Sequence, residues 1–248
     1  MPGATLDRVM RIAIVADIHG NLTAFEAVLA DLRQTSPDLV FHGGDLADAG
    51  SSPVEIVDQV RALGWQGVRG NTDEMLATPD TFKEFASQRP HLQPIFTAVE
   101  AMATLTRARL GEGRLEWLRG LPSSQFHGPL ALVHASPESP WKSPLRDASD
   151  AELESVYKGL GKTVAVYGHI HQAYIRNVSG MIVANSGSVS LSYDGDRRAS
   201  YFLLNDGKPE IRRVEYDVEK EIQALAICGM PHADWVTKIL RSAGPVMP

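Results

Sequence analysis

Short apolar runs recur along this chain, and each is followed shortly by an aspartate, asparagine or histidine. The runs and the polar residues after them are 12–16 with Asp17 and His19, 38–41 with Asp45, 67–69 with Asn71, 130–133 with His134, and 164–167 with His169 and His171. Continuous apolar runs of this length are typical of buried strands in parallel sheets. In sheets built from strand–helix units, ligand sites lie beyond the carboxyl ends of the strands. The repeated order therefore predicts one polar site at the carboxyl edge of a sheet.

The opening third of the chain alternates strand and helix patterns. After the first apolar run, apolar residues recur at helical spacing from Leu22 to Leu32, and Asn21 is a candidate N-cap for this helix. A second helix is predicted over 53–63, with proline in its first turn. This alternation is typical of an α/β fold with a largely parallel sheet.

The rest of the chain adds three regions to this unit. A helical pattern over about 81–119 predicts an insert that covers the sheet edge, and we consider it as a lid over the site. Residues 124–134 are predicted to return to strand, and the stretch from 174 to 216 reads as all-β. A helical tail is expected over about 218–248. We predict a single domain spanning residues 1–248.

Composition excludes several classes of function. Of the 248 residues, 44% are hydrophobic and 22% charged, which is ordinary for one large globular domain. The net charge is -6 with no basic stripe, so general nucleic-acid binding is not expected. The single cysteine, Cys228, excludes a disulfide within the chain and a cysteine metal cluster. We find neither a signal peptide nor a stretch long enough to span a bilayer, and expect a cytoplasmic protein without membrane contact.

The seven polar residues offer nitrogen and oxygen ligands and no sulfur. This set suits Mn, Fe, Ni, Co or Zn, whereas calcium prefers oxygen alone. Seven ligands are too many for one tetrahedral ion, but they fit two ions that share a carboxylate and together clamp a phosphoryl group. Taken singly, Asp17 could be a helix cap, Asp45 a turn residue and His134 a buried core histidine. Their joint occurrence favours a metal site.

At these residues the sequence resembles the calcineurin-like metallophosphoesterases. The matching motifs, in order, are Asp17-x-His19, Gly44-Asp45, Gly70-Asn71-x-Asp73, His134 and Gly168-His169-x-His171. The stretch Asn185-Ser186-Gly187-Ser188 further resembles the Asn-Pro-Gly-Ser motif of the family, with serine replacing proline.

The resemblance implies a fold and a division of roles. The fold would be a four-layer αββα sandwich, a metallophosphoesterase fold with a helical insert. One metal would be held by Asp17, His19, Asp45 and His171, and the second by Asp45, Asn71, His134 and His169, with Asp45 bridging. Asp45, Asn71, Asp73 and His134 would be the catalytic residues, and Asp73 would orient the neighbouring loop.

Thr72 departs from the pattern of the larger phosphatases of the family, where a histidine after the motif asparagine is thought to protonate the leaving oxygen. Threonine is no useful acid near pH 7, so the general-acid contribution, typically about 10²–10⁴ in rate, is absent or supplied elsewhere. The resemblance therefore favours hydrolysis of phosphodiesters or dinucleoside polyphosphates by attack of a metal-bridged hydroxide on phosphorus. The alternatives are a phosphomonoesterase, acting on proteins or small molecules, and a non-catalytic scaffold on the same fold.

The resemblance and the sequence also lead to expectations about cofactors, the binding partner and substrate contacts. The cofactors would be two divalent ions, with manganese preferred over iron, nickel, cobalt and zinc. The partner would be a small phosphorylated compound, nucleotides included, and the sequence does not predict an oligomeric state. Asn21 and Thr72 are candidate substrate contacts. For Asn21 an N-cap is an equal alternative, and His42 is expected to pack in the interior.

Overall fold

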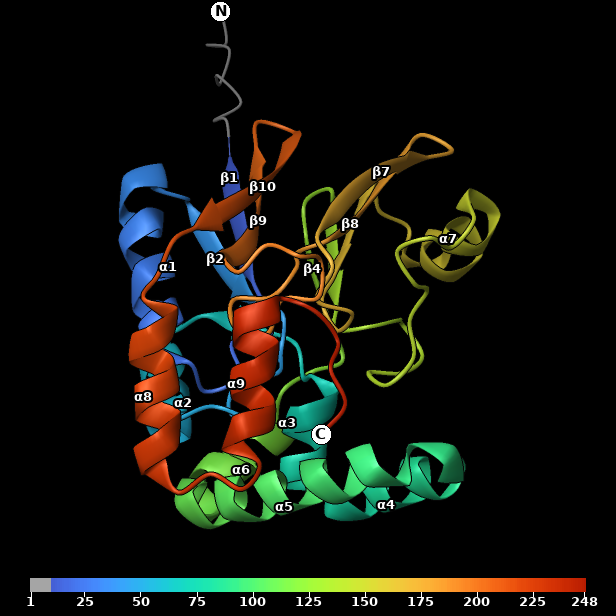
Figure 1. Ribbon diagram of the computed structural model, residues 1–248. Coiled ribbons are helices and arrows are strands. Elements are labelled where there is room, and N and C mark those ends of the chain that lie inside the picture. The colour runs from blue at the N-terminus through green and yellow to red at the C-terminus, as the bar shows by residue number, and fades with distance from the viewer. Residues whose placement is uncertain (1–9) are drawn as a thin grey trace, which may run out of the picture.

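The computed structural model describes residues 10–248 and contains two five-stranded sheets that face each other between outer layers of helices (Figure 1). The first sheet has the order β10-β9-β1-β2-β3, and the second has the order β4-β5-β6-β8-β7. Within residues 10–248, no helix is both long and apolar enough to cross a membrane.

The first sheet is built by the alternating opening of the chain together with a late hairpin. Its strands are β1 (Arg11–Val15), β2 (Leu39–His42), β3 (Gln66–Gly67), β9 (Ala199–Asn205) and β10 (Lys208–Val214). Strands β1, β2 and β3 are parallel, as the strand–helix alternation predicted. Strands β9 and β10 are antiparallel, so the sheet is mixed rather than largely parallel.

The second sheet has a parallel centre and antiparallel edges. Its strands are β4 (Ser124–His127), β5 (Leu130–Val133), β6 (Val164–Tyr167), β7 (Tyr174–Val178) and β8 (Met181–Asn185). Strands β5, β6 and β8 are parallel, while β4 and β7 pair antiparallel at the two edges. The single strand predicted over 124–134 is therefore wrong. It is a hairpin, because Gly128 adopts a left-handed φ of 51° and turns the chain.

Alternating side chains on β1 explain the layers. Ile12 and Ile14 pack with Leu132 and Val166 of the second sheet, and this apolar cluster fills the space between the sheets. Ala13 and Val15 point to the other face and join the core under the helices α1 (Leu22–Thr35) and α2 (Pro53–Ala62). A strand with both faces covered is apolar at every position, which is why residues 12–15 form one continuous run.

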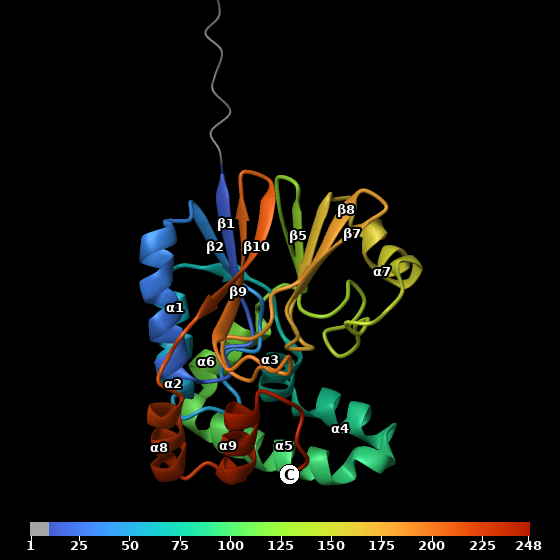
Figure 2. The same ribbon diagram turned by 45° about the horizontal axis from the view of Figure 1, so that its top comes forward.

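The helices occupy both outer faces and the carboxyl end of the strands (Figure 2). Helices α1 (Leu22–Thr35) and α2 (Pro53–Ala62) cover the first sheet, and α7 (Asp150–Tyr157), followed by the 3-10 turn η2 (Lys158–Leu160), covers the second. The resulting αββα order is the four-layer sandwich expected from the resemblance.

Two groups of helices lie at the carboxyl end of the strands. The bounds of the first group are α3 (Asn71–Ala77), α4 (Pro79–Ser87), η1 (Pro90–Leu92), α5 (Gln93–Leu110) and α6 (Glu112–Arg119). The second group consists of α8 (Val218–Cys228) and α9 (Ala233–Ser242). Both groups stand below the strands in the two views, on the side where the polar residues follow the sheets.

Candidate metal centre

Six of the metal-ligand candidates lie in tight loops after the strands, and Asn71 is the first residue of α3. Five of them have left-handed backbone, with φ of 56° at Asp17, 47° at His19, 53° at Asp45, 67° at His169 and 55° at His171. This conformation is costly for residues other than glycine and collects at functional sites. Neighbouring loops hold one another, since the Asp17 amide donates to the Gly44 carbonyl (3.1 Å) and the His19 amide donates to the Asp45 carbonyl (2.9 Å).

Four of the predicted residues form a compact buried group, here called group A: Asp17, His19, Asp45 and His171. One ligand atom from each lies within 4.8 Å of the others. The Nε2 atoms of His19 and His171 are 3.2 Å apart. His19 Nε2 lies 3.6 Å from Asp45 Oδ2, and His171 Nε2 lies 3.4 Å from Asp17 Oδ1. The structure thus brings together residues from the first sheet and His171 from the second.

The remaining candidates converge beside the other oxygen of Asp45 and form group B: Asp45, Asn71, His134 and His169. Asn71 Oδ1 lies 2.9 Å from His134 Nε2 and 2.8 Å from His169 Nδ1. Asp45 Oδ1 lies 3.5 Å from His134 Nε2, while its Oδ2 faces His19 of group A. The carboxylate of Asp45 is therefore placed between the two groups.

Backbone carbonyls fix the tautomers of three histidines. The Nδ1 of His19 faces the Asp48 carbonyl at 3.0 Å, that of His134 faces the Gly43 carbonyl at 2.8 Å, and that of His171 faces the Leu191 carbonyl at 2.6 Å. A carbonyl only accepts, so each Nδ1 carries the hydrogen and each neutral ring presents a lone pair on Nε2.

The lone pairs in both groups converge on one another. In group A, two imidazole lone pairs face each other next to two carboxylates, and in group B the lone pair of His134 faces the acceptor oxygen of Asn71. Such an arrangement of acceptors is repulsive unless a cation lies among them. The donor set therefore fits two divalent cations, one in each group.

Electrostatics favour the neutral, metal-binding form of His19 and His169, whereas burial is outweighed by Asp45 at His134 and by Asp17 at His171, which raises the pKa of these two rings. Burial lowers the pKa of His19, and it lowers the pKa of His169 to about 4, so both rings are neutral at pH 7. Burial opposes ionisation of Asp45, but the neighbouring His134 and His19 rings, together with the hydrogen bond from the Thr72 amide, outweigh it and lower the pKa of this carboxyl. Neutral imidazole and ionised carboxylate are the forms that bind metal.

Asp73 supports the loops and lies outside both groups. Its Oδ2 accepts from the amides of Asp45 (2.8 Å) and Gly70 (2.9 Å), and its Oδ1 accepts from Leu46 (3.0 Å). Burial and the charge of Asp45 raise its pKa to about 6. The loops approach closely, because a Cβ added at Gly70 would lie 2.0 Å from Asp45 Oδ1.

The two predicted substrate contacts occupy different environments. Thr72 donates its amide to Asp45 Oδ1 (2.9 Å), lines the cavity next to the groups, and its hydroxyl has no partner among the described residues. Asn21 is buried, accepts from the Ala24 amide (2.9 Å) as the N-cap of α1, and donates to Ser190 Oγ (3.1 Å). Both polar ends of Asn21 are thus used within the fold, which matches its N-cap alternative.

A cavity of about 370 Å³ opens directly beside the two groups. Its polar side contains His19, Asp45, Asn71, His169 and His171, and its other side is apolar. A second cavity of about 230 Å³ reaches His134 and contains Arg69.

Two residues that line this first cavity, Asp48 and Tyr193, were not predicted from the sequence. Burial raises the pKa of Asp48 to about 7, and its Oδ1 accepts from Thr106 Oγ1 at 2.8 Å. The ring of Tyr193 stacks on His171 with centroids 4.9 Å apart. Neither stands at the end of an apolar run, so only the folded chain reveals their place.

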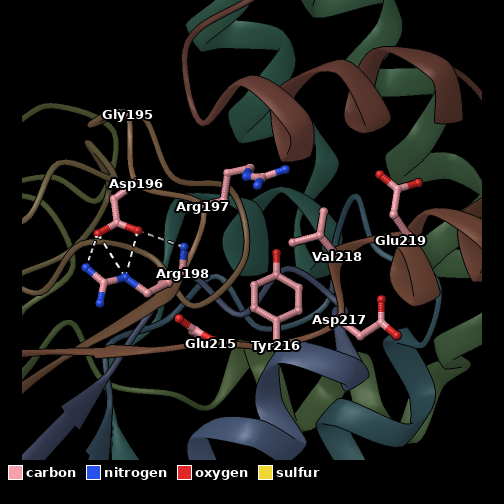
Figure 3. Close-up of a pocket in the computed structure, with 9 residues that line it drawn as sticks. All are labelled: Gly195, Asp196, Arg197, Arg198, Glu215, Tyr216, Asp217, Val218 and Glu219. Atoms are coloured by element: carbon pink, nitrogen blue, oxygen red, sulfur yellow. Dashed lines mark hydrogen bonds and ion pairs between the residues drawn. The ribbon is translucent and has the colours of Figure 1, made fainter.

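A larger cavity lies elsewhere. It has a volume of about 740 Å³ and is bordered by residues 195–198 and 215–219, none of which belongs to group A or B. Figure 3 shows its mixed charges, with Asp196 and Arg198 paired with each other at 2.7 Å. We assign no metal role to this cavity.

Comparisons with known proteins identify the family of the chain. The family model described as the calcineurin-like phosphoesterase superfamily domain matches residues 10–208. An uncharacterized protein of Methanocaldococcus jannaschii is 28% identical, and the match covers 91% of this chain and 95% of that protein.

Two crystal structures share the fold. A metallophosphoesterase from Sphaerobacter thermophilus superposes with a TM-score of 0.76 at 24% identity, covering 95% of this chain and 99% of that one. A hypothetical protein from Pyrococcus horikoshii superposes with a TM-score of 0.82 at 19% identity, covering 96% and 100%. With the family model spanning most of its length and a cluster of aspartates and histidines suited to divalent metal, this chain belongs to the calcineurin-like phosphoesterase superfamily, the metal-dependent hydrolases of phosphoric esters.

Proposed function

We propose that this protein hydrolyses phosphodiesters with two divalent metals, manganese being the first candidate. The observation that carries the proposal is the position of Asp45. Its two oxygens face His19 and His134, so one carboxylate serves both groups. Group A would hold one ion and group B the other. When bound there, two divalent ions would supply a hydroxide nucleophile and neutralise the charge that develops at phosphorus.

The protein supplies orientation around this centre. Asp73 holds the loops of Asp45 and Asn71 through three backbone amides, which fixes the distance between the groups. Thr72 borders the cavity, and its unpartnered hydroxyl is buried, so a rotation of this side chain would let the hydroxyl donate to a phosphoryl oxygen. This donor would orient the substrate, but it cannot protonate a leaving group near pH 7.

The choice of phosphodiester follows from Thr72. An alkyl monoester has a poor leaving group that needs a proton, whereas activated diesters and polyphosphates leave with little protonation. Dinucleoside polyphosphates satisfy the same requirement and are the second candidate. Manganese, like a cytoplasmic location, remains a prediction from the sequence.

A metal-resolved activity assay tests the proposal. Apoprotein reconstituted with Mn, Ni, Co, Fe or Zn would be assayed on a monoester, a diester and a dinucleoside tetraphosphate. We expect about two ions per chain, with diester turnover that is lost in Asp45→Asn. Full metal content without turnover on any substrate would refute catalysis and favour the scaffold alternative.

The Thr72→His variant tests the specificity argument. An imidazole here would add a group able to protonate the leaving oxygen, so the ratio of monoester to diester kcat/KM should rise, by up to roughly 10²–10⁴-fold. Thr104→His, on the exposed side of α5, is the matched control and should leave the ratio unchanged. An unchanged ratio in Thr72→His would remove Thr72 as the determinant.

A further inference from the structure

The cavity beside the metal ligands has an apolar wall built by segments far apart in the sequence. Ile95, Val99 and Met102 contribute it from α5, and Trp235, Val236 and Ile239 contribute it from α9. Residues 245–247 close the wall. The two views place α5 and α9 next to each other (Figure 2), and residues of both helices pack in one cluster. Met102, Trp235 and Val236 belong to one packed apolar cluster, so this wall is part of the core.

Trp235 shows how the wall stays apolar. Its Nε1 donates to the Val246 carbonyl at 2.7 Å, which satisfies the only polar atom of the indole. The same bond holds residues 245–247 against α9. The carbon surface of the ring is therefore left to line the cavity.

Positive charge is missing from this cavity. No lysine or arginine is among the described residues that line it, and its acidic members are Asp45 and Asp48. The neighbouring smaller cavity contains Arg69, but this guanidinium already binds the Arg119 carbonyl (3.0 Å) and Glu74 Oε1 (3.4 Å). A chain of phosphates beyond the one at the metals would find no lysine or arginine among these lining residues, which is unfavourable.

Resting on the proposed function, we infer that this cavity binds the organic group of the phosphoester. The group is an uncharged aryl or alkyl group, and the substrate carries a single phosphate. A cavity of about 150 Å³ lined by apolar side chains is enough to bind benzene, so about 370 Å³ accommodates a larger group. Pockets that are apolar on one side and polar at a reactive edge recognise ligands in this way. The inference selects diesters over dinucleoside polyphosphates.

Binding of non-hydrolysable phosphonates tests the inference independently of turnover. Methylphosphonate, phenylphosphonate and 1-naphthylphosphonate present the same head group with increasing apolar area. Isothermal titration of the manganese-loaded protein should give an affinity that rises roughly tenfold or more from methyl to naphthyl. Met247→Gln should weaken naphthyl binding and leave methyl binding unchanged. Met247 is 57% exposed, so this substitution does not endanger folding.

Ile227→Gln is the matched control, because Ile227 is 87% exposed on α8 and does not line the cavity. It should bind all three phosphonates like the wild type. Equal affinity for the three phosphonates, or equal losses in Met247→Gln and Ile227→Gln, would overturn the inference. A kcat/KM for diadenosine tetraphosphate above that for an aryl diester would also overturn it.

The two proposals fail in different ways. If phosphonate affinity rises with apolar area but no diester is hydrolysed, the proposed function is rejected and the cavity remains an apolar binding site. Diester hydrolysis with phosphonate binding that ignores apolar area would keep the function and reject the cavity assignment.

Discussion

Replacement of His42 by leucine should flatten the dependence of stability on pH. His42 ends β2, is fully buried, and neither ring nitrogen has a hydrogen-bond partner among the described residues. The ring packs against the backbone of Gly67, where an added Cβ would lie 2.4 Å from it. A charged imidazolium would be poorly solvated in these surroundings. Burial therefore lowers the pKa of His42 from 6.5 to about 4.

The magnitude follows from proton linkage. The unfolded chain binds the proton of His42 more tightly than the folded chain, so this residue makes the free energy of unfolding fall as pH drops below about 6.5. A pKa near 4 in the folded state corresponds to a loss of about 2 kcal/mol between pH 7 and pH 5, and about 3 kcal/mol by pH 4. At pH 7 the contribution is close to zero.

Urea unfolding of metal-free protein at pH 4.5 to 7.5 measures this effect, with chelator present so that metal binding does not add its own pH dependence. The difference in unfolding free energy between wild type and His42→Leu should change by about 2 kcal/mol from pH 7 to pH 5. His91→Leu, at an exposed position, controls for the loss of a histidine and should follow the wild type. A difference that stays constant within about 0.5 kcal/mol would refute the reasoning.

Three further predictions concern the metal centre. Asp73→Ala leaves the buried amides of Asp45, Leu46 and Gly70 without an acceptor, so the free energy of unfolding should fall by about 3 kcal/mol or more in urea titrations; a loss below about 1 kcal/mol would contradict this. Gly70→Ala places a Cβ 2.0 Å from Asp45 Oδ1 and should lower bound metal measured by elemental analysis, whereas Gly113→Ala, with open space around it, should not. Removal of metal with EDTA should lower Tm, since ligand at about 100 times its Kd contributes about 3 kcal/mol; an unchanged Tm would argue against ion binding in the folded state.

The sequence predicted the parts of the site that depend on local pattern. Four of the five apolar runs became strands, whereas the run 67–69 overlaps β3 only at Gly67. The ligand residues after the runs met at one edge because parallel strands end together. The helix of seven residues that begins at Asn71 was not predicted, because it is too short to show a helical period.

Other features depend on contacts that no local pattern records. The apolar wall joins Met102 to Trp235, and the position of Asp48 beside Thr106 depends on how α5 crosses the loops. The predicted helical pattern of residues 81–119 and of the tail gave no indication that these two regions would pack together. Amphipathic helices specify that a face is buried, but they do not specify the partner that covers it.

The contact between His19 and His171 couples metal binding to the packing of the two sheets. His19 follows a strand of the first sheet and His171 follows a strand of the second, 152 residues later, and their ring nitrogens meet at 3.2 Å. An ion bound by both histidines would be a reversible cross-link between the two sheets. Unlike a disulfide, this cross-link forms only while the two sheets are packed together. It therefore stabilises the folded state without restraining the unfolded chain. Metal occupancy and docking of the two sheets would then be linked in both directions, each raising the other.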